Sequence, residues 1–277
     1  MRRTDLAKLL VITLALPALL LPAATLIYIV FRGAPALDWA FLTTTGEGVG
    51  FGNSSGILAQ ILGSLLLAVG ASLLAAPIAF GAALYYCLLA GPRQRHLLLT
   101  LLNMLHGVPP IVFGLCGLIL FVHLLQWGVS LLTGAVTLAA VILPLLMLNT
   151  VAALERVAIE QTEAAQALGL SHATLVWRVW LPQAWPGIVT GQLLAMARVL
   201  SETAPILFTA TVFSGVVWPG SIFEPVTTLQ THIFYLAQEG NNAQATQVAW
   251  GSALVLIVMV AIFGVLARWL KTWRVTV

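Results

Sequence analysis

The stretch Glu163–Pro182 reads EAAQALGLSHATLVWRVWLP, and the rest of the chain is arranged around it. It is the longest interruption of an otherwise apolar sequence that still has helical character. Apolar segments long enough to cross a membrane lie on both sides of it. Crossing a bilayer does not require an ordered amphipathic insert, so we expect another protein to bind this segment.

Within the stretch, the residues predict two short helices joined by a hinge. Gly169 can adopt the left-handed conformation that ends a helix, and Ser171 is a favourable N-cap for the next one. Pro182 is expected to end the second helix before the next apolar segment. Between Ser171 and Pro182, apolar residues at helical spacing form one stripe, which consists of Leu175, Val176, Val179 and Trp180.

A second interpretation of the insert is an amphipathic helix that lies on the lipid surface. The tryptophans Trp177, Trp180 and Trp185 suit an interface. The polar face carries little positive charge, however, and Glu160 and Glu163 would repel anionic lipid. A protein partner is therefore the favoured interpretation.

The composition places the whole chain in a membrane. Hydrophobic residues make up 60% of the 277 residues and charged residues 8%, which is too much apolar surface for a water-soluble domain to bury. The sequence predicts an all-α membrane protein with six transmembrane helices. We expect them at about Leu9–Phe31, Ile57–Ala90, Leu97–Gln126, Val129–Leu154, Gln183–Phe213 and Gln244–Leu270.

The distribution of basic residues predicts the orientation. With the N-terminus inside, ten of the twelve Lys and Arg residues fall on the inner side, which predicts that both termini and the insert are cytoplasmic. Only Arg32, at the edge of a span, falls outside, and Arg198 lies within the fifth span. The inner residues are Arg2, Arg3, Lys8, Arg93, Arg95, Arg156, Arg178, Arg268, Lys271 and Arg274.

The insert also carries a family resemblance. Glu163-Ala164-Ala165, then Gly169, then Val179-x-Leu181-Pro182 resembles the EAA loop of ABC-importer permeases. The resemblance implies a type I ABC importer permease (MetI-like) architecture, with a permease core in 57–277 and coupling helices at 160–182. Residues 1–56 would form a first transmembrane helix and a periplasmic loop. Through the same resemblance, the residues expected to contact the ATPase subunit are Glu163, Ala164, Ala165 and Gly169.

The chain has no nucleotide-binding motif of its own. A GxxxxGK[ST] phosphate loop is absent, and Lys8 and Lys271 are the only lysines. We therefore expect a transporter subunit rather than an enzyme, with no cofactor bound by this chain and with ATP and Mg on a partner ATPase.

Arg198 and Glu202 are charged residues inside the predicted fifth span. They are four residues apart and would share a helix face, so one interpretation is an ion pair that neutralises itself. The other is a cationic element of an anion pathway, because the planar fork of arginine can donate two parallel hydrogen bonds to an oxyanion. Pro205 removes an amide donor from the same helix, which makes Ser201 and Thr203 further pathway candidates.

The surrounding motifs resemble phosphate-importer permeases of the PstA type. These motifs are ARVLSETAPILFTA, from Ala197 to Ala210, and GVPPIVFGLCG, from Gly107 to Gly117. The resemblance implies inorganic phosphate as substrate and a bacterial inner-membrane location. It also implies three partners, namely a PstB-type ATPase, a PstC-type second permease and a periplasmic PstS-type phosphate-binding protein. No nucleic-acid partner is expected, because the basic residues are not clustered as they are in nucleic-acid-binding proteins.

Other functions stay open at this point. A permease for sulfate or molybdate would share the same architecture. A proton-coupled secondary carrier would use Arg198 and Glu202 as a relay, but it would predict inverted repeats and need no docking insert. A scaffold or sensor without transport would not require the intramembrane charge pair.

Overall fold

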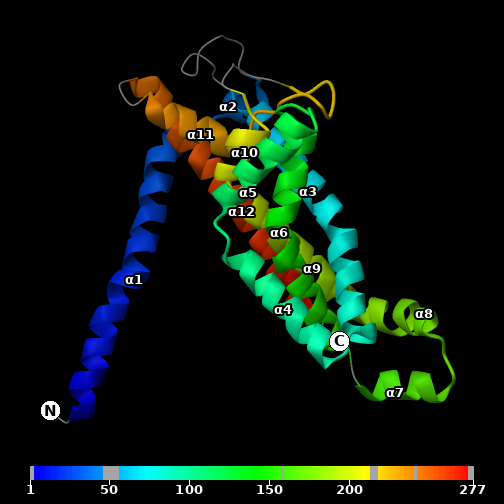
Figure 1. The fold of residues 1–277 in the computed structure, drawn as a ribbon. Helices are drawn as coiled ribbons and strands as arrows, with labels where there is room; N and C mark the ends of the chain where they lie inside the picture. Colours follow the sequence, from blue (N-terminus) through cyan, green and yellow to red (C-terminus); the bar gives the residue numbers. More distant parts are fainter. Residues whose placement is uncertain (1–2, 46–55, 158, 213–217, 240–241, 274–277) are drawn as a thin grey trace.

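The computed structural model is a helical bundle and describes residues 3–45, 56–157, 159–212, 218–239 and 242–273 (Figure 1). Its α-helices are α1 (Arg3–Gly33), α2 (Trp39–Thr43), α3 (Leu58–Leu84), α4 (Pro92–Gly107), α5 (Pro110–Gly117), α6 (Leu131–Leu154), α7 (Ile159–Ala167), α8 (His172–Leu175), α9 (Leu181–Leu200), α10 (Ala204–Thr209), α11 (Leu229–Gln238) and α12 (Ala243–Trp273). A 3₁₀ turn, η1 (Ala34–Ala36), follows α1. Three π-helical segments extend other helices, namely η2 (Tyr85–Leu89), η3 (Leu118–Leu124) and η4 (Val176–Trp180).

Several helices have the length and apolarity of membrane spans. Among the described residues four qualify, at Val11–Ala36, Leu58–Leu89, Leu131–Leu154 and Ala243–Lys271. The pair Pro92–Gly107 and Pro110–Leu124 would count as a fifth, although it is bent by 89°. The chain is thus an all-helical protein with four or five candidate spans. The number six and the cytoplasmic termini stay predictions.

The centre of the bundle is formed by α3, α6 and α9, with α12 packed against α9. On α3, one face consists of alanines spaced three or four residues apart, all completely buried: Ala68, Ala71, Ala75, Ala79 and Ala83. Small side chains at this spacing allow neighbouring helices to approach closely. The small-residue character of this segment therefore serves helix packing within the chain.

Helix α1 stands apart from the bundle and approaches it at one end (Figure 1). There, a Cβ atom on Gly33 would lie 2.6 Å from the backbone oxygen of Trp250 in α12. The ring of Tyr28 packs edge-on against Trp250 at 5.3 Å. Most described side chains of α1 are exposed, and none in its most apolar window is buried.

The helix boundaries differ from the expected ones at several places. The expected third span is interrupted between Gly107 and Pro110, where α4 and α5 meet at 89°. Pro182 does not end a helix: the backbone stays right-handed helical from α8 through η4 into α9, where Pro182 occupies the first turn. The segment 32–56, between the first two expected spans, contains α2, and the segment 214–243, between the last two, contains α11, although the sequence predicts a loop in both places. The glycine-rich part of the first loop, 46–55, lies outside the described residues, as do Arg2 and Arg274.

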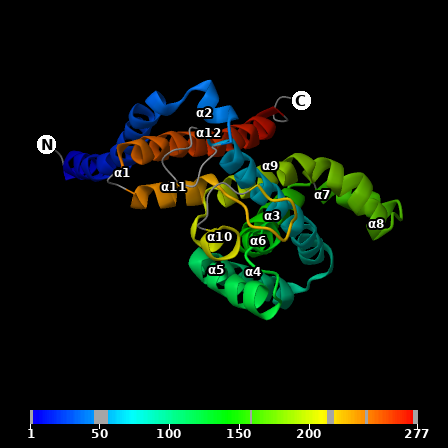
Figure 2. The same ribbon diagram turned by 90° about the horizontal axis from the view of Figure 1, so that it is seen from above.

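The two ends of the bundle differ. One end carries α7 and α8, which project from the side of the bundle when it is seen from above (Figure 2). We call it the α7–α8 end. The other end carries α2, α10 and α11, and we call it the α11 end (Figure 1).

Candidate functional site

The predicted fifth span is broken into two helices. Helix α9 ends at Leu200, and α10 begins at Ala204. Pro205 lies in the first turn of α10, where the missing amide hydrogen removes no helical bond. Pro205 therefore begins a helix, whereas the sequence had suggested that it interrupts one. Irregular backbone at membrane depth is tolerated where it is enclosed by protein or lines a cavity.

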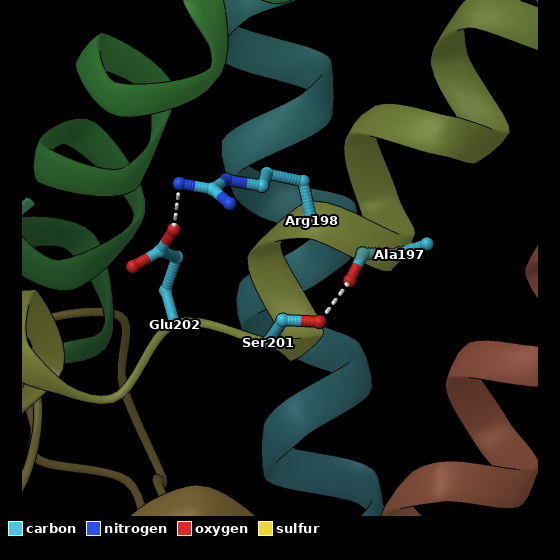
Figure 3. Close-up of polar contacts among 4 residues, drawn as sticks. All are labelled: Ala197, Arg198, Ser201 and Glu202. Carbon is cyan, nitrogen blue, oxygen red and sulfur yellow. Dashed lines mark hydrogen bonds and ion pairs between the residues drawn. The ribbon is translucent and has the colours of Figure 1, made fainter. Parts of the chain in front are cut away.

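Arg198 and Glu202 form an ion pair across this break (Figure 3). Nη2 of Arg198, in the last turn of α9, lies 2.7 Å from Oε1 of Glu202. The two side chains differ in exposure: 51% for Arg198 and 9% for Glu202. Glu202 is thus the buried partner, and the guanidinium keeps an exposed face with further N–H donors.

Ser201 and Thr203 occupy the break itself. The hydroxyl of Ser201 donates to the backbone oxygen of Ala197 at 3.0 Å, as Figure 3 shows. Ser201 is exposed, whereas Thr203 is half-buried at the N-cap of α10 and makes no capping bond through its side chain. All four predicted pathway residues are therefore neighbours, and Arg198 and Ser201 are the exposed ones.

A buried network that sequence reasoning missed holds the end of α9. The side chain of Gln230, in α11, donates from Nε2 to the backbone oxygen of Leu200 at 2.9 Å. Its Oε1 accepts from the hydroxyl of Ser64 in α3 at 3.0 Å. Ser64 in turn accepts from the amide of Leu229 at 2.9 Å. The available signal was Ser64, a polar residue inside an apolar segment, because a buried polar side chain needs hydrogen-bond partners.

Helix α10 is fixed from several sides. In α5, a Cβ atom on Gly114 would lie 2.8 Å from Cα of Pro205, so this glycine permits close contact with α10. At the other end of α10, the oxygens of Thr209 and Ala210 accept from the amides of Ser130 and Val226 at 3.0 and 2.9 Å. The two PstA-like motifs are thus in direct contact: 107–117 packs against 197–210, which contains the break.

The hinge of the insert has the predicted geometry. Gly169 has φ +70°, and no atom would lie within 4 Å of a Cβ placed on it. The hydroxyl of Ser171 accepts from the amide of Thr174 at 3.3 Å and caps α8. In the apolar stripe that follows, Leu175 and Val176 are buried and Val179 and Trp180 half-buried.

The predicted docking residues do not all face outward. Glu163, Ala164 and Gly169 are exposed, but Ala165 is 5% exposed and is buried within the chain itself. Beside the hinge, Leu168 is 81% exposed, the largest value among the exposed large hydrophobic side chains. Leu168 thus lies on the same exposed surface as the residues expected to contact the ATPase.

Polar contacts also hold the insert together and stabilise the turn between η2 and α4. The indole Nε1 of Trp180 donates to the hydroxyl of Thr162 at 3.1 Å, which connects η4 with α7. Arg95 donates to the backbone oxygens of Ala90 and Cys87 at 3.0 and 2.9 Å, and so caps the end of η2. Its guanidinium also lies 5.4 Å from the centre of the Tyr86 ring.

Comparison with known families assigns the chain. Residues 75–274 match the family described as "Binding-protein-dependent transport system inner membrane component". The chain belongs to this family. This permease is therefore a membrane component of a transport system and not a catalytic enzyme.

Individual relatives support the PstA resemblance. The permease is 32% identical over 257 residues to "Probable ABC transporter permease protein YqgI" of Bacillus subtilis, covering 88% of this chain and 87% of the relative. It is 31% identical over 252 residues to "Phosphate transport system permease protein PstA 2" of Mycobacterium bovis, covering 90% and 82%. It is 34% identical over 246 residues to "Probable phosphate transport system permease protein PstA" of Methanocaldococcus jannaschii, covering 86% and 83%. These matches confirm the resemblance to PstA-type permeases.

Solved structures show the same fold at low sequence identity. A chain of a bacterial alginate ABC transporter, solved in complex with an alginate pentasaccharide-bound periplasmic protein, superposes with a TM-score of 0.64 at 15% identity, covering 96% of this chain and 93% of that one. A chain of the inward-facing MetNI methionine ABC transporter superposes with a TM-score of 0.59 at 16% identity, covering 78% and 95%. The predicted MetI-like permease fold is thereby confirmed.

Proposed function

We propose that this permease is the transmembrane subunit of an ATP-driven importer for inorganic phosphate, in which it forms half of the translocation pathway. The observation that carries the proposal is the half-exposed guanidinium of Arg198 at the break between α9 and α10. A planar guanidinium donates parallel hydrogen bonds that match a tetrahedral oxyanion. The relatives that carry the name PstA support phosphate as the oxyanion.

Glu202 gives the site a means of release. While no anion is bound, its carboxylate neutralises part of the charge of Arg198. An arriving oxyanion competes with Glu202 for the guanidinium, so its binding is weaker than at an isolated arginine. Transport requires such moderate affinity, because the anion has to leave as well as enter.

The insert is the proposed connection to the ATPase. Glu163, Ala164 and Gly169, together with exposed Leu168, would seat in a groove of a PstB-type ATPase, which binds ATP and Mg. Ala165 would support the helix from within. The other partners are a PstC-type second permease and a periplasmic PstS-type phosphate-binding protein. Closure of the ATPases on ATP would draw the inserts together and shift the permeases towards an outward-open state.

The test is phosphate uptake by the assembled complex in proteoliposomes that contain ATP. Arg198→Ala should reduce uptake of radiolabelled phosphate to near background, while the subunits still purify together because the side chain is half exposed. Arg93→Ala is the matched control, since it removes an exposed arginine that lies outside the helix break. Unchanged uptake by Arg198→Ala would return the ion pair to a purely structural role.

A permease for another oxyanion is the second candidate, because a guanidinium also recognises sulfate and molybdate. Competition decides between them. Excess unlabelled sulfate or molybdate should leave phosphate uptake unchanged, and strong inhibition by either anion would replace phosphate as the proposed cargo.

A further inference from the structure

A cavity lies near the α7–α8 end, away from the helix break. It is open on one side, is lined by residues of α6, α9 and α12, and has a volume of about 290 Å³. This volume is at the lower end of the range for ligand pockets, about 300–1,000 Å³. The cavity therefore has room for a small polar group rather than for a large metabolite.

Two cationic side chains line this cavity, from segments far apart in the sequence. Arg156 follows the end of α6, and Lys271 lies in the last turn of α12. Among the described residues, no carboxylate lies within ion-pair distance of either one. The neighbouring Glu155 lines a different pocket, together with Arg95. The cavity thus has an unneutralised positive charge.

The wall of the cavity offers a further donor. Nδ2 of Asn149 is buried, and no described residue accepts a hydrogen bond from it. Gly191 on α9 brings the helices together here, because a Cβ atom on it would lie 2.9 Å from Cβ of Asn149. Gly187, one turn away, approaches Ala153 in the same manner. A buried donor without a partner is unfavourable, and an acceptor ligand in the cavity would offset that cost.

We propose that this cavity binds a phosphate group, with Arg156 and Lys271 as the charged contacts and Asn149 as a neutral donor. Two cationic side chains without a neighbouring carboxylate favour the binding of an anion. Basic pockets between membrane helices bind the phosphate-bearing headgroups of lipids. The group can come from inorganic phosphate or from an anionic phospholipid. The proposal goes beyond the transport function and does not depend on which anion passes Arg198.

The experiment measures binding to the purified complex after removal of lipid, in an Arg198→Ala background so that the site at the helix break does not contribute. One arm is equilibrium dialysis with radiolabelled inorganic phosphate. The other arm is native mass spectrometry with added phosphatidylglycerol, compared with zwitterionic phosphatidylcholine. Binding of radiolabelled phosphate in the dialysis identifies the free anion as the ligand. Preferential binding of phosphatidylglycerol over phosphatidylcholine identifies the lipid headgroup.

Two variants locate the binding. Arg156→Gln combined with Lys271→Gln should weaken it by about tenfold or more, since charge-assisted hydrogen bonds are lost. Ala152→Phe, at an exposed position in the cavity wall, should block the cavity without a change in charge. Arg93→Gln, which removes an exposed cation at the same end of the bundle but outside the cavity, should bind like the parent. The proposal is overturned if neither probe binds, or if both cavity variants bind as tightly as the parent.

Discussion

Gln230 of α11 donates a hydrogen bond to the backbone oxygen of Leu200, at the residue where α9 ends. Gln230 is 5% exposed, and Ser64, which donates to its Oε1, is 1% exposed. A tertiary contact with two other helices therefore fixes the end of α9. Arg198 lies in the last turn of that helix, so its position depends on α11. Within the described residues, no hydrogen bond joins α11 directly to Arg198 or Glu202.

Gln230→Leu should destabilise the protein and impair transport. The substitution leaves the hydroxyl of Ser64 and the oxygen of Leu200 buried with one partner fewer, at a cost of about 1–3 kcal/mol. We expect a lower midpoint of thermal unfolding in detergent and a reduced rate of uptake at saturating phosphate. Gln238→Leu, at an exposed position of the same helix, should change neither quantity. A fully active and stable Gln230→Leu variant would remove the network from the mechanism.

Glu202→Gln should tighten substrate binding and slow turnover. The substitution removes the negative charge 2.7 Å from the guanidinium, so an oxyanion no longer competes with a carboxylate for Arg198. We expect the KM for phosphate uptake and kcat to fall together, each by roughly tenfold if the lost competition amounts to about 1.4 kcal/mol. Saturation curves in proteoliposomes measure both, with Glu239→Gln as the control outside the site. A rise in KM would contradict the proposed role of Glu202 in release.

Gly169→Ala should impair coupling to the ATPase without loss of membrane insertion. At φ +70° an alanine costs about 1–2 kcal/mol of backbone strain, whereas its Cβ would meet no neighbouring atom. The hinge would therefore shift and reorient α7 and Leu168. We expect lower substrate-stimulated ATP hydrolysis by the assembled complex.

Gly128→Ala is the matched control for that experiment. Gly128 has φ +69° and equally open surroundings, but it lies between η3 and α6, away from the insert. The same backbone strain at this position should leave ATP hydrolysis coupled to uptake. Equal losses in both variants would show that strain alone, and not the geometry of the insert, causes the defect.

Gly114→Val should prevent close packing of α5 against α10. A Cβ atom at this position would lie 2.8 Å from Cα of Pro205, and a backbone atom cannot move aside cheaply. Overpacking of this kind costs about 1–3 kcal/mol. We expect a lower unfolding temperature and reduced uptake, compared with Gly264→Ala, whose added Cβ meets no atom within 4 Å. Wild-type stability of Gly114→Val would show that α5 and α10 can separate freely.

Local rules predicted the features that depend on neighbouring residues. The left-handed hinge at Gly169, the cap at Ser171 and the burial of Leu175 and Val176 all follow from residues within one or two helical turns. The ion pair between Arg198 and Glu202 was foreseen for the same reason, since its members are four residues apart.

Features that depend on distant partners were missed or assigned incorrectly. Ser64 and Gln230 are separated by 166 positions, and nothing near either residue identifies the other. The prolines illustrate a related difficulty, because proline tolerates the first turn of a helix as well as it disrupts the middle of one. Pro182 and Pro205 both lie in a first turn, and the sequence alone did not locate those helix starts.

The separate attachments of α9 and α10 have a mechanical consequence. Helix α9 is continuous in backbone conformation with α8 and η4, whereas the oxygens at the end of α10 are bonded to Ser130 and Val226 at the opposite end of the bundle. Helices α9 and α10 are thus attached to different parts of the molecule, and the three residues 201–203 connect them. We therefore expect a displacement that begins at the insert to be transmitted along α9 to residues 201–203, beside Arg198 and Glu202.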